Sequence, residues 1–126
     1  MPFDTSLQLQ RVTDSILGRR PDVVGLSAQF QHRSHDFLTL ARELRHRGYT
    51  GHVTAGGQFP TMAFREVLAR ENGVDSIVLH EGEQTFVELL SALSDERPLT
   101  EVKGLALPGH GLPFRTEGRP LEDLDR

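Results

Sequence analysis

The chain has 126 residues, with 14 Lys and Arg against 18 Asp and Glu, for a formal net charge of −4. That length suits one domain, which buries roughly two-thirds of the surface of its unfolded chain. Because the sequence holds no Cys, it excludes a disulfide framework, a thiolate zinc site, an iron–sulfur cluster and a Cys nucleophile on this chain. Mild acidity argues against a nucleic-acid surface, and no apolar run reaches the ~18 residues of a membrane span. We expect a soluble, cytoplasmic domain without a nucleic-acid or membrane partner, because the N-terminal residues also lack a secretion signal.

The first third of the chain predicts a helix, a strand and a second helix. Residues 6–19 carry apolar side chains near one helical face, with candidate caps before them and Gly18 and Pro21 at the end. Residues 23–26 form a short apolar run, typical of a strand that is buried on both faces. A polar loop over residues 27–32 then leads into an amphipathic helix over residues 34–47, which Gly48 is placed to end.

The middle of the chain repeats this alternation. Residues 52–55 and 76–79 predict strands, residues 56–61 predict a turn, and residues 62–71 predict a helix that Asn72 and Gly73 stop. After a loop over residues 80–83, a helix to about residue 93 is expected to turn its apolar side chains inward. Strands alternating with helices predict an α/β fold with a mostly parallel sheet, and right-handed crossovers place helices on both of its faces.

The C-terminal part changes character. Residues 104–107 predict one more strand, and residues 112–115 can pair with it across a turn at residues 108–111. Residues 119–126 are polar and aperiodic, as in a linker. The sequence therefore predicts an α/β domain over residues 1–107, followed over residues 108–126 by a hairpin and linker.

Three loops are expected at the carboxyl edge of the sheet, where open α/β sheets bind ligands. One begins with the hydroxyl of Ser27, one contains the Gly56-Gly57 pair, and one places Gly82 between Glu81 and Glu83. Each has a simpler reading, since a Gly pair can be only a tight turn, a Ser only a local cap, and two Glu only a favourable helix start. No catalytic partner for the carboxylates is recognisable, and the six His match no metal-ligand spacing.

Taken together, these motifs resemble the cobalamin-binding (B12-binding) domain. In that family one strand ends in S-x-L and a later strand ends in G-G. Ser27-Ala28-Gln29 stands at the first motif, with Gln in place of Leu, and Gly56-Gly57 stands at the second.

The remainder is most similar to the N-terminal B12 domain of cobalamin-dependent radical SAM enzymes. Their G-E-G-E loop is matched by residues 80–83, their G-L-A-Y strand by residues 104–107, and their P-I-E-D-L-D linker by residues 120–125. The resemblance implies a Rossmann-like (flavodoxin-like) three-layer α/β/α fold that holds the nucleotide tail of cobalamin between strands. It places the following residues at the cofactor: Ser27, Ala28, Gln29, Phe30, Gly56, Gly57, Gln58, Phe59, Glu81, Gly82 and Glu83.

Within that resemblance the roles differ. Ser27 would contact the dimethylbenzimidazole, the Gly56-Gly57 turn would let the backbone pass close to the tail, and the loop from Glu81 to Glu83 would line the corrin or the tail. The chain alone is not expected to turn over a substrate, because it offers no convincing catalytic residue. S-adenosylmethionine and a [4Fe-4S] cluster would belong to a radical SAM partner domain or chain.

The chain also departs from the family. It has neither the D-x-H-x-x-G motif that supplies a lower cobalt ligand nor the C-x-x-x-C-x-x-C run of a radical SAM domain. The family's first strand–helix–strand unit is not recognisable, which predicts an unpaired edge on the strand at residues 23–26. We therefore expect a cobalamin-binding domain, or a fragment of one, that serves a radical SAM methyltransferase-type reaction carried out elsewhere.

Two alternatives remain open at this stage. The chain can be a cofactor-free α/β interaction module or homodimer that uses its exposed sheet edge. It can also be a flavodoxin-like or nucleotide-binding domain, although it has no G-x-G-x-x-G run or P-loop.

Overall fold

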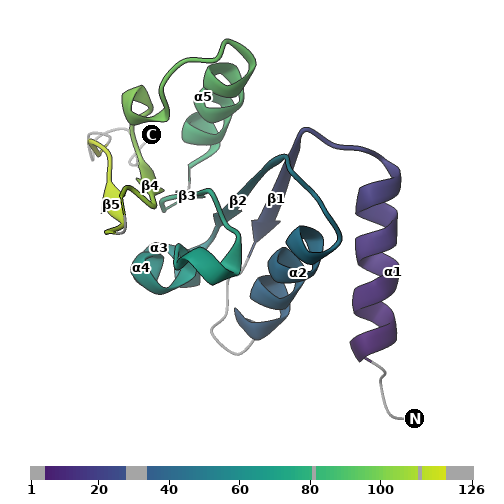
Figure 1. The fold of residues 1–126 in the computed structure, drawn as a ribbon. Helices are drawn as coiled ribbons and strands as arrows, with labels where there is room; N and C mark the ends of the chain where they lie inside the picture. The colour runs from purple at the N-terminus through teal and green to yellow at the C-terminus, as the bar shows by residue number, and fades with distance from the viewer. Residues whose placement is uncertain (1–4, 28–33, 81, 111, 119–126) are drawn as a thin grey trace.

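A computed structural model of the chain describes residues 5–27, 34–80, 82–110 and 112–118. Five strands form one sheet, in the spatial order β1-β2-β3-β4-β5 (Figure 1). The strands are β1 (Val23–Ser27), β2 (His52–Gly56), β3 (Ser76–Val78), β4 (Leu105–Leu107) and β5 (Phe114–Arg115). β1, β2 and β3 run parallel, whereas β4 pairs antiparallel with β3 and with β5.

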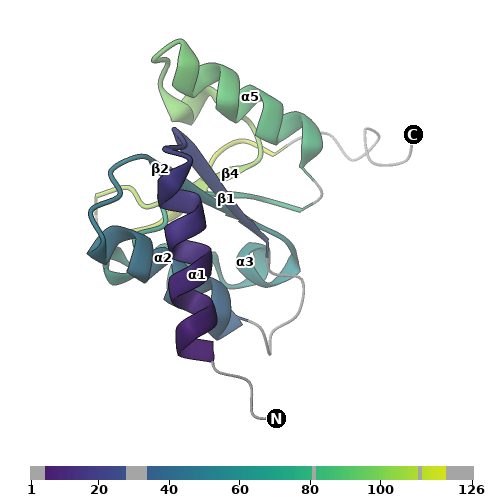
Figure 2. The ribbon, with the colours of Figure 1, turned by 90° about the vertical axis from the view of Figure 1, so that its right-hand side faces the viewer.

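Helices cover both faces of this sheet. They are α1 (Thr5–Gly18), α2 (Ser34–His46), α3 (Gln58–Met62), α4 (Phe64–Val67) and α5 (Glu83–Ser94), with short 3₁₀ turns η2 (Arg70–Asn72) and η3 (Leu99–Glu101). In Figure 2, α5 lies on one side of the sheet and α2 and α3 lie on the other. The three layers and the mostly parallel order confirm the predicted Rossmann-like α/β/α fold.

Two cores follow from the alternation of side chains along the strands. On the first face, Val53 and Ile77 are buried against Leu44 of α2 and the other members of a large apolar cluster. On the second face, which carries Gly25, Thr54 and Val78, a smaller cluster joins Val78 to Leu89 of α5. This smaller cluster lies over β3 and β4, and it includes no residue of β1 or β2.

The strand β1 is less buried than its apolar sequence predicts. Only Val24 of this strand is buried, while Gly25 and Ser27 are exposed. The prediction of a strand buried on both faces is therefore wrong. The physical reason is position, because β1 is the first strand in the sheet order and the described residues pair it only with β2. The unpaired edge expected from the sequence is present in the described part of the chain.

The segment between β2 and β3 is also built differently from the prediction. Instead of one helix over residues 62–71, the chain forms α3, α4 and η2, with a break at Ala63. Residues 58–61, predicted as a turn, belong to α3 because Pro60 is tolerated in the first helical turn, where the missing N–H needs no acceptor. Asn72 stops the segment as predicted, since its amide donates to the carbonyls of Glu66 (2.9 Å) and Val67 (3.3 Å).

The predicted hairpin at the C-terminal side is confirmed. Leu107 pairs with Phe114, and the pairing continues where the Thr116 N–H donates to the Leu105 carbonyl at 2.8 Å. The division of the chain at residue 107 stays a prediction. Among the residues described, no helix combines the length and the apolar character that a membrane span requires.

Candidate functional site

The parallel strands end in one row at the carboxyl edge of the sheet. Ser27 pairs in register with Gly56, and Gly56 pairs with Val78. Because parallel strands point the same way, the segments that follow them leave the sheet at one edge, where α/β folds bind ligands. The structure thus brings together two motifs that are 29 positions apart in sequence (56 minus 27), the Ser and the Gly pair.

The three glycines of the predicted site are glycines for different reasons. Gly57 has a φ of +112°, a backbone conformation that side chains rarely adopt. A Cβ on Gly82 would lie 2.5 Å from Val78 Cγ1, so close packing requires glycine there. Among the described atoms, a Cβ on Gly56 would meet the Val78 carbonyl oxygen alone, at 3.8 Å, which is an ordinary contact. Within the described part of the chain, neither a positive φ nor close packing therefore accounts for Gly56.

The remaining predicted residues are placed only in part. Ser27 is the exposed last residue of β1, and Glu83 is the exposed first residue of α5. Gln58 and Phe59 open α3, but only their backbone is described. The last four predicted residues lie outside the described part of the chain: Ala28, Gln29, Phe30 and Glu81.

Sequence reasoning missed residues of the second face that lie beside this row. Gly25 and Thr54 pair in register, two positions before Ser27 and Gly56, and Phe86 of α5 lies beside Gly25. A glycine inside a strand often marks the close approach of a ligand or of another backbone, so Gly25 could have been recognised as a candidate from the sequence. Phe86 carried no such signal, since it was expected to point into the core.

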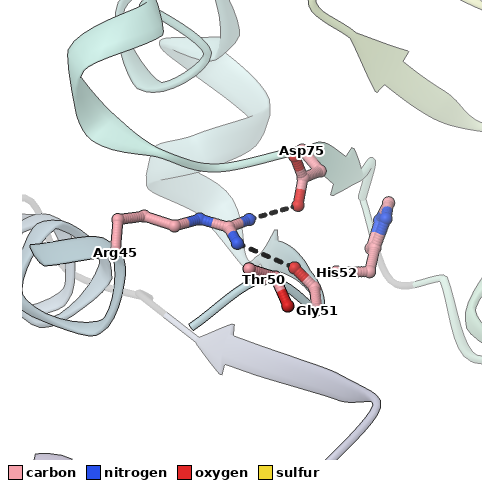
Figure 3. A pocket seen from close by; sticks show the side chains of 5 residues that line it. All are labelled: Arg45, Thr50, Gly51, His52 and Asp75. Atoms are coloured by element: carbon pink, nitrogen blue, oxygen red, sulfur yellow. Dashed lines mark hydrogen bonds and ion pairs between the residues drawn. The ribbon is translucent and has the colours of Figure 1, made fainter. Parts of the chain in front are cut away.

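A polar cluster occupies the opposite, amino edge of the same strands (Figure 3). Arg45 of α2 donates to the carbonyls of Gly73 (3.0 Å), Tyr49 (2.9 Å) and Gly51 (2.8 Å), and to the Asp75 carboxylate at 2.5 Å. Asp75 also accepts the Val53 N–H at 2.8 Å. An open cavity of about 360 Å³ lies here, lined by Arg45, Thr50, Gly51, His52 and Asp75. Since the guanidinium and carboxylate already bind each other and the backbone, the cluster fastens α2 to the strand ends.

A chain of hydrogen bonds runs beneath that cluster. Thr54 Oγ1 donates to the Ser76 carbonyl (3.2 Å) and accepts from Ser76 Oγ (2.8 Å), so His52 Nε2, at 2.8 Å from Ser76 Oγ, is the donor there. Burial lowers the pKa of His52, and nearby Arg45 lowers it further, against the opposing effect of Asp75. These effects together favour the neutral form of His52. The described residues include no group of three or more His, Asp or Glu that could hold a metal ion.

A family model described as "B12 binding domain" matches residues 3–90. The chain belongs to the B12-binding domain family. The resemblance predicted from Ser27-Ala28-Gln29 and Gly56-Gly57 is thereby confirmed. At the carboxyl edge of this B12-binding domain, no described atom lies closer than 3.8 Å to the position of a Gly56 Cβ, so the described residues leave room for a group close to the backbone there.

Curated relatives of this B12-binding domain are much longer proteins. An anaerobic magnesium-protoporphyrin IX monomethyl ester cyclase from Synechocystis sp. is 36% identical over 74 residues, which are 58% of this chain and 15% of the relative. An uncharacterized methyltransferase from Pyrococcus horikoshii is 32% identical over 101 residues, which are 80% of this chain and 22% of the relative. The chain thus spans less than a quarter of these relatives.

Solved structures of similar fold come from radical SAM enzymes. The cobalamin-dependent S-adenosylmethionine radical enzyme OxsB, with aqua-cobalamin and S-adenosylmethionine bound, gives a TM-score of 0.72 at 23% identity, covering 89% of this chain and 16% of OxsB. The radical S-adenosylmethionine methyltransferase TsrM from Kitasatospora setae, with cobalamin and a [4Fe-4S] cluster bound, gives 0.63 at 25% identity, covering 79% of this chain and 19% of TsrM. This B12-binding domain is therefore similar to those of B12-dependent radical SAM enzymes.

Proposed function

We propose that this domain holds cobalamin with its nucleotide tail along the carboxyl edge of β1 and β2. The observation that carries the proposal is Gly56. A glycine within a strand costs conformational entropy, and among the described residues no close contact of Gly56 offsets that cost. A ligand that approaches the backbone closely would account for the glycine at position 56, and the family of the chain indicates that this ligand is cobalamin.

The other predicted residues complete the site. The exposed hydroxyl of Ser27 lies on the same face as Gly56 and can hydrogen-bond the dimethylbenzimidazole at the end of the tail. Gly57 turns the chain away from the tail, and Glu83 borders the corrin at the start of α5. The remaining proposed contacts come from Ala28, Gln29, Phe30, Gln58, Phe59, Glu81 and Gly82.

The cobalt of bound cobalamin would supply a methyl group or electrons to a radical SAM methyltransferase-type reaction. S-adenosylmethionine and the [4Fe-4S] cluster would lie on another domain or chain, since this sequence has no Cys. Two similar structures support this division, since OxsB has S-adenosylmethionine bound, TsrM has a [4Fe-4S] cluster bound, and both chains are several times longer than this one. The protein's part is to bind and orient the cofactor. Its cytoplasmic location stays a prediction.

The test is a titration of the purified chain with hydroxocobalamin, followed by the corrin absorbance. Gly56→Ala places a methyl group in the proposed path of the tail, and we expect it to weaken binding about tenfold or more. Gly18→Ala is the matched control, because a Cβ at Gly18 would have no described atom within 4 Å and lies at the end of α1, away from the site. Absence of any spectral change with the unmodified chain at tens of micromolar would overturn the proposal.

The edge of β1 supports a second candidate function. In the described residues this edge is unpaired, and its sequence from Val23 to Ser27 has no charge and no Pro to block pairing. The chain would then dock a partner or a second copy of itself without a cofactor. A stable dimer in light scattering, together with no uptake of corrin, would favour this function over cobalamin binding.

A further inference from the structure

Phe86 is an exposed aromatic side chain at an unusual place on the second face of the sheet. Its ring atom Cε1 would lie 3.9 Å from a Cβ added at Gly25, so the ring reaches from α5 to the middle of β1. Even so, the residue is 37% exposed. The apolar cluster beneath α5 contains Val78, Leu89 and Leu105 but not Phe86.

The start of α5 is held firmly, so the backbone that carries the Phe86 ring has a defined position. Thr85 is buried, and its Oγ1 donates to the Lys103 carbonyl at 3.1 Å. Gly82 packs against Val78, and Leu89 one turn further along is fully buried. A ring fixed in this way loses little conformational freedom when a ligand packs against it.

The surface beside the ring is apolar, although it contains a threonine. Thr54 Cγ2 would also lie 3.9 Å from a Cβ at Gly25. The Thr54 hydroxyl donates to the Ser76 carbonyl and accepts from the Ser76 hydroxyl, and its methyl group lies on the side of Gly25. Gly25 itself has no side chain. The surface beside it is therefore formed by the Phe86 ring, the Thr54 methyl group and the backbone of β1.

This place lies next to the proposed cobalamin site. Gly25 and Thr54 are on the same face as Ser27 and Gly56, two residues earlier on the same two strands. An exposed ring beside an apolar surface favours a flat aromatic ligand group, because offset stacking between the two rings adds to the gain from burying apolar surface.

We propose that Phe86 is a specificity-determining residue of this site, which stacks on the aromatic base at the end of the tail and selects corrinoids that carry such a base. The inference rests on the proposed function, since it concerns the same site. Thr54 and Gly25 are positioning residues, because they leave room for the base beside the ring.

The experiment compares two ligands on the full chain, namely hydroxocobalamin and dicyanocobinamide, a corrin without the nucleotide tail. We expect the unmodified chain to prefer the tailed ligand. Phe86→Ala is expected to weaken the binding of hydroxocobalamin about tenfold and to leave that of dicyanocobinamide within about twofold. Phe86→Leu keeps apolar bulk without a flat ring, and we expect an intermediate loss.

Val87→Ala is the matched control, because Val87 is the next residue of α5 and is 65% exposed. It is expected to change neither affinity, and thermal melting verifies that each variant is folded. An unmodified chain that binds neither corrin overturns the proposed function itself. If the unmodified chain binds the two corrins equally, the role of Phe86 is overturned and the proposed function stands. The same conclusion follows if Phe86→Ala keeps the preference for hydroxocobalamin, or if it loses no more affinity than Val87→Ala.

Discussion

Arg45 of α2 and Asp75 lie at the amino ends of β2 and β3, where they bind each other and the surrounding backbone, whereas Ser27 and Gly56 lie at the carboxyl ends of β1 and β2. At the amino edge, the polar groups of Arg45 and Asp75 are therefore used by contacts within the protein. At the carboxyl edge, Ser27 is exposed, and a Cβ on Gly56 would meet no described atom closer than 3.8 Å. The ion pair that fastens α2 to the strand ends thus lies at the edge opposite to the one proposed for the ligand. Mutations at the amino edge should therefore change stability, and those at Gly56 should change binding.

The largest effect is expected at Arg45. Arg45→Met keeps much of the apolar stem but removes the donors to three carbonyls and to Asp75. We expect the free energy of unfolding in urea to fall by about 2–4 kcal/mol. Arg11→Met, at an exposed position of α1, should stay within about 0.5 kcal/mol. A loss at Arg45 no larger than that of the control would contradict the assigned role of the amino edge.

Gly82→Ala should give the next largest effect, although it lies at the carboxyl edge. Its Cβ would come within 2.5 Å of Val78 Cγ1, which forces the start of α5 away from β3. Overpacking of this kind costs about 1–3 kcal/mol, measured as the shift of the urea midpoint at constant slope. An unchanged midpoint would mean that Gly82, like Gly56, is free of packing constraints.

The adjacent pair Gly56 and Gly57 gives a sharper comparison. Gly57→Ala should cost about 1–2 kcal/mol, because its φ of +112° is strained for any residue with a Cβ. Gly56→Ala should change stability by less than about 0.5 kcal/mol, since the added methyl would meet no close neighbour among the described residues. Thermal melts of both variants measure the difference. Equal losses would remove the argument that Gly56 is kept for a ligand.

The smallest expected effect is a pH dependence at His52. Its pKa is lowered in the folded state, chiefly by burial, so the unfolded chain binds a proton more readily. The contribution of His52 is therefore fully present above the unfolded pKa of about 6.5 and is lost as the pH falls below it.

The measurement compares urea midpoints at several pH values between about 7.5 and 5 for the unmodified chain and His52→Gln. Gln can still donate to Ser76 but does not titrate, so its stability should fall less toward low pH. Parallel curves for the two proteins would show that His52 does not contribute.

The sequence predicted what depends on local pattern. The alternation of strands and helices, the stop at Asn72 and the hairpin ending near Arg115 all follow from periodicity and turn chemistry. The placement of Ser27 beside Gly56 follows too, because parallel strands bring their carboxyl ends to one edge.

What it missed depends on neighbours that are distant in sequence. The apolar side chains of α5 were expected to face inward, yet Phe86, Val87 and Leu90 are exposed, while Leu89 is buried. Hydrophobicity alone cannot tell which side of a helix is covered, because that depends on the width of the sheet beneath it. The contact of Arg45 with Asp75, 30 positions apart, has no local sequence signal either.

The two lateral borders of the sheet have consequences for self-association. In the described residues, β1 offers a border of five residues without charge or proline, whereas β5 contributes only two residues at the other border. If two copies joined through β1, the free hydrogen-bonding edge of β1 in each copy would be paired with that of the other. A dimer joined in this way would be a closed pair related by two-fold symmetry, so pairing of β1 with β1 would not propagate a fibre.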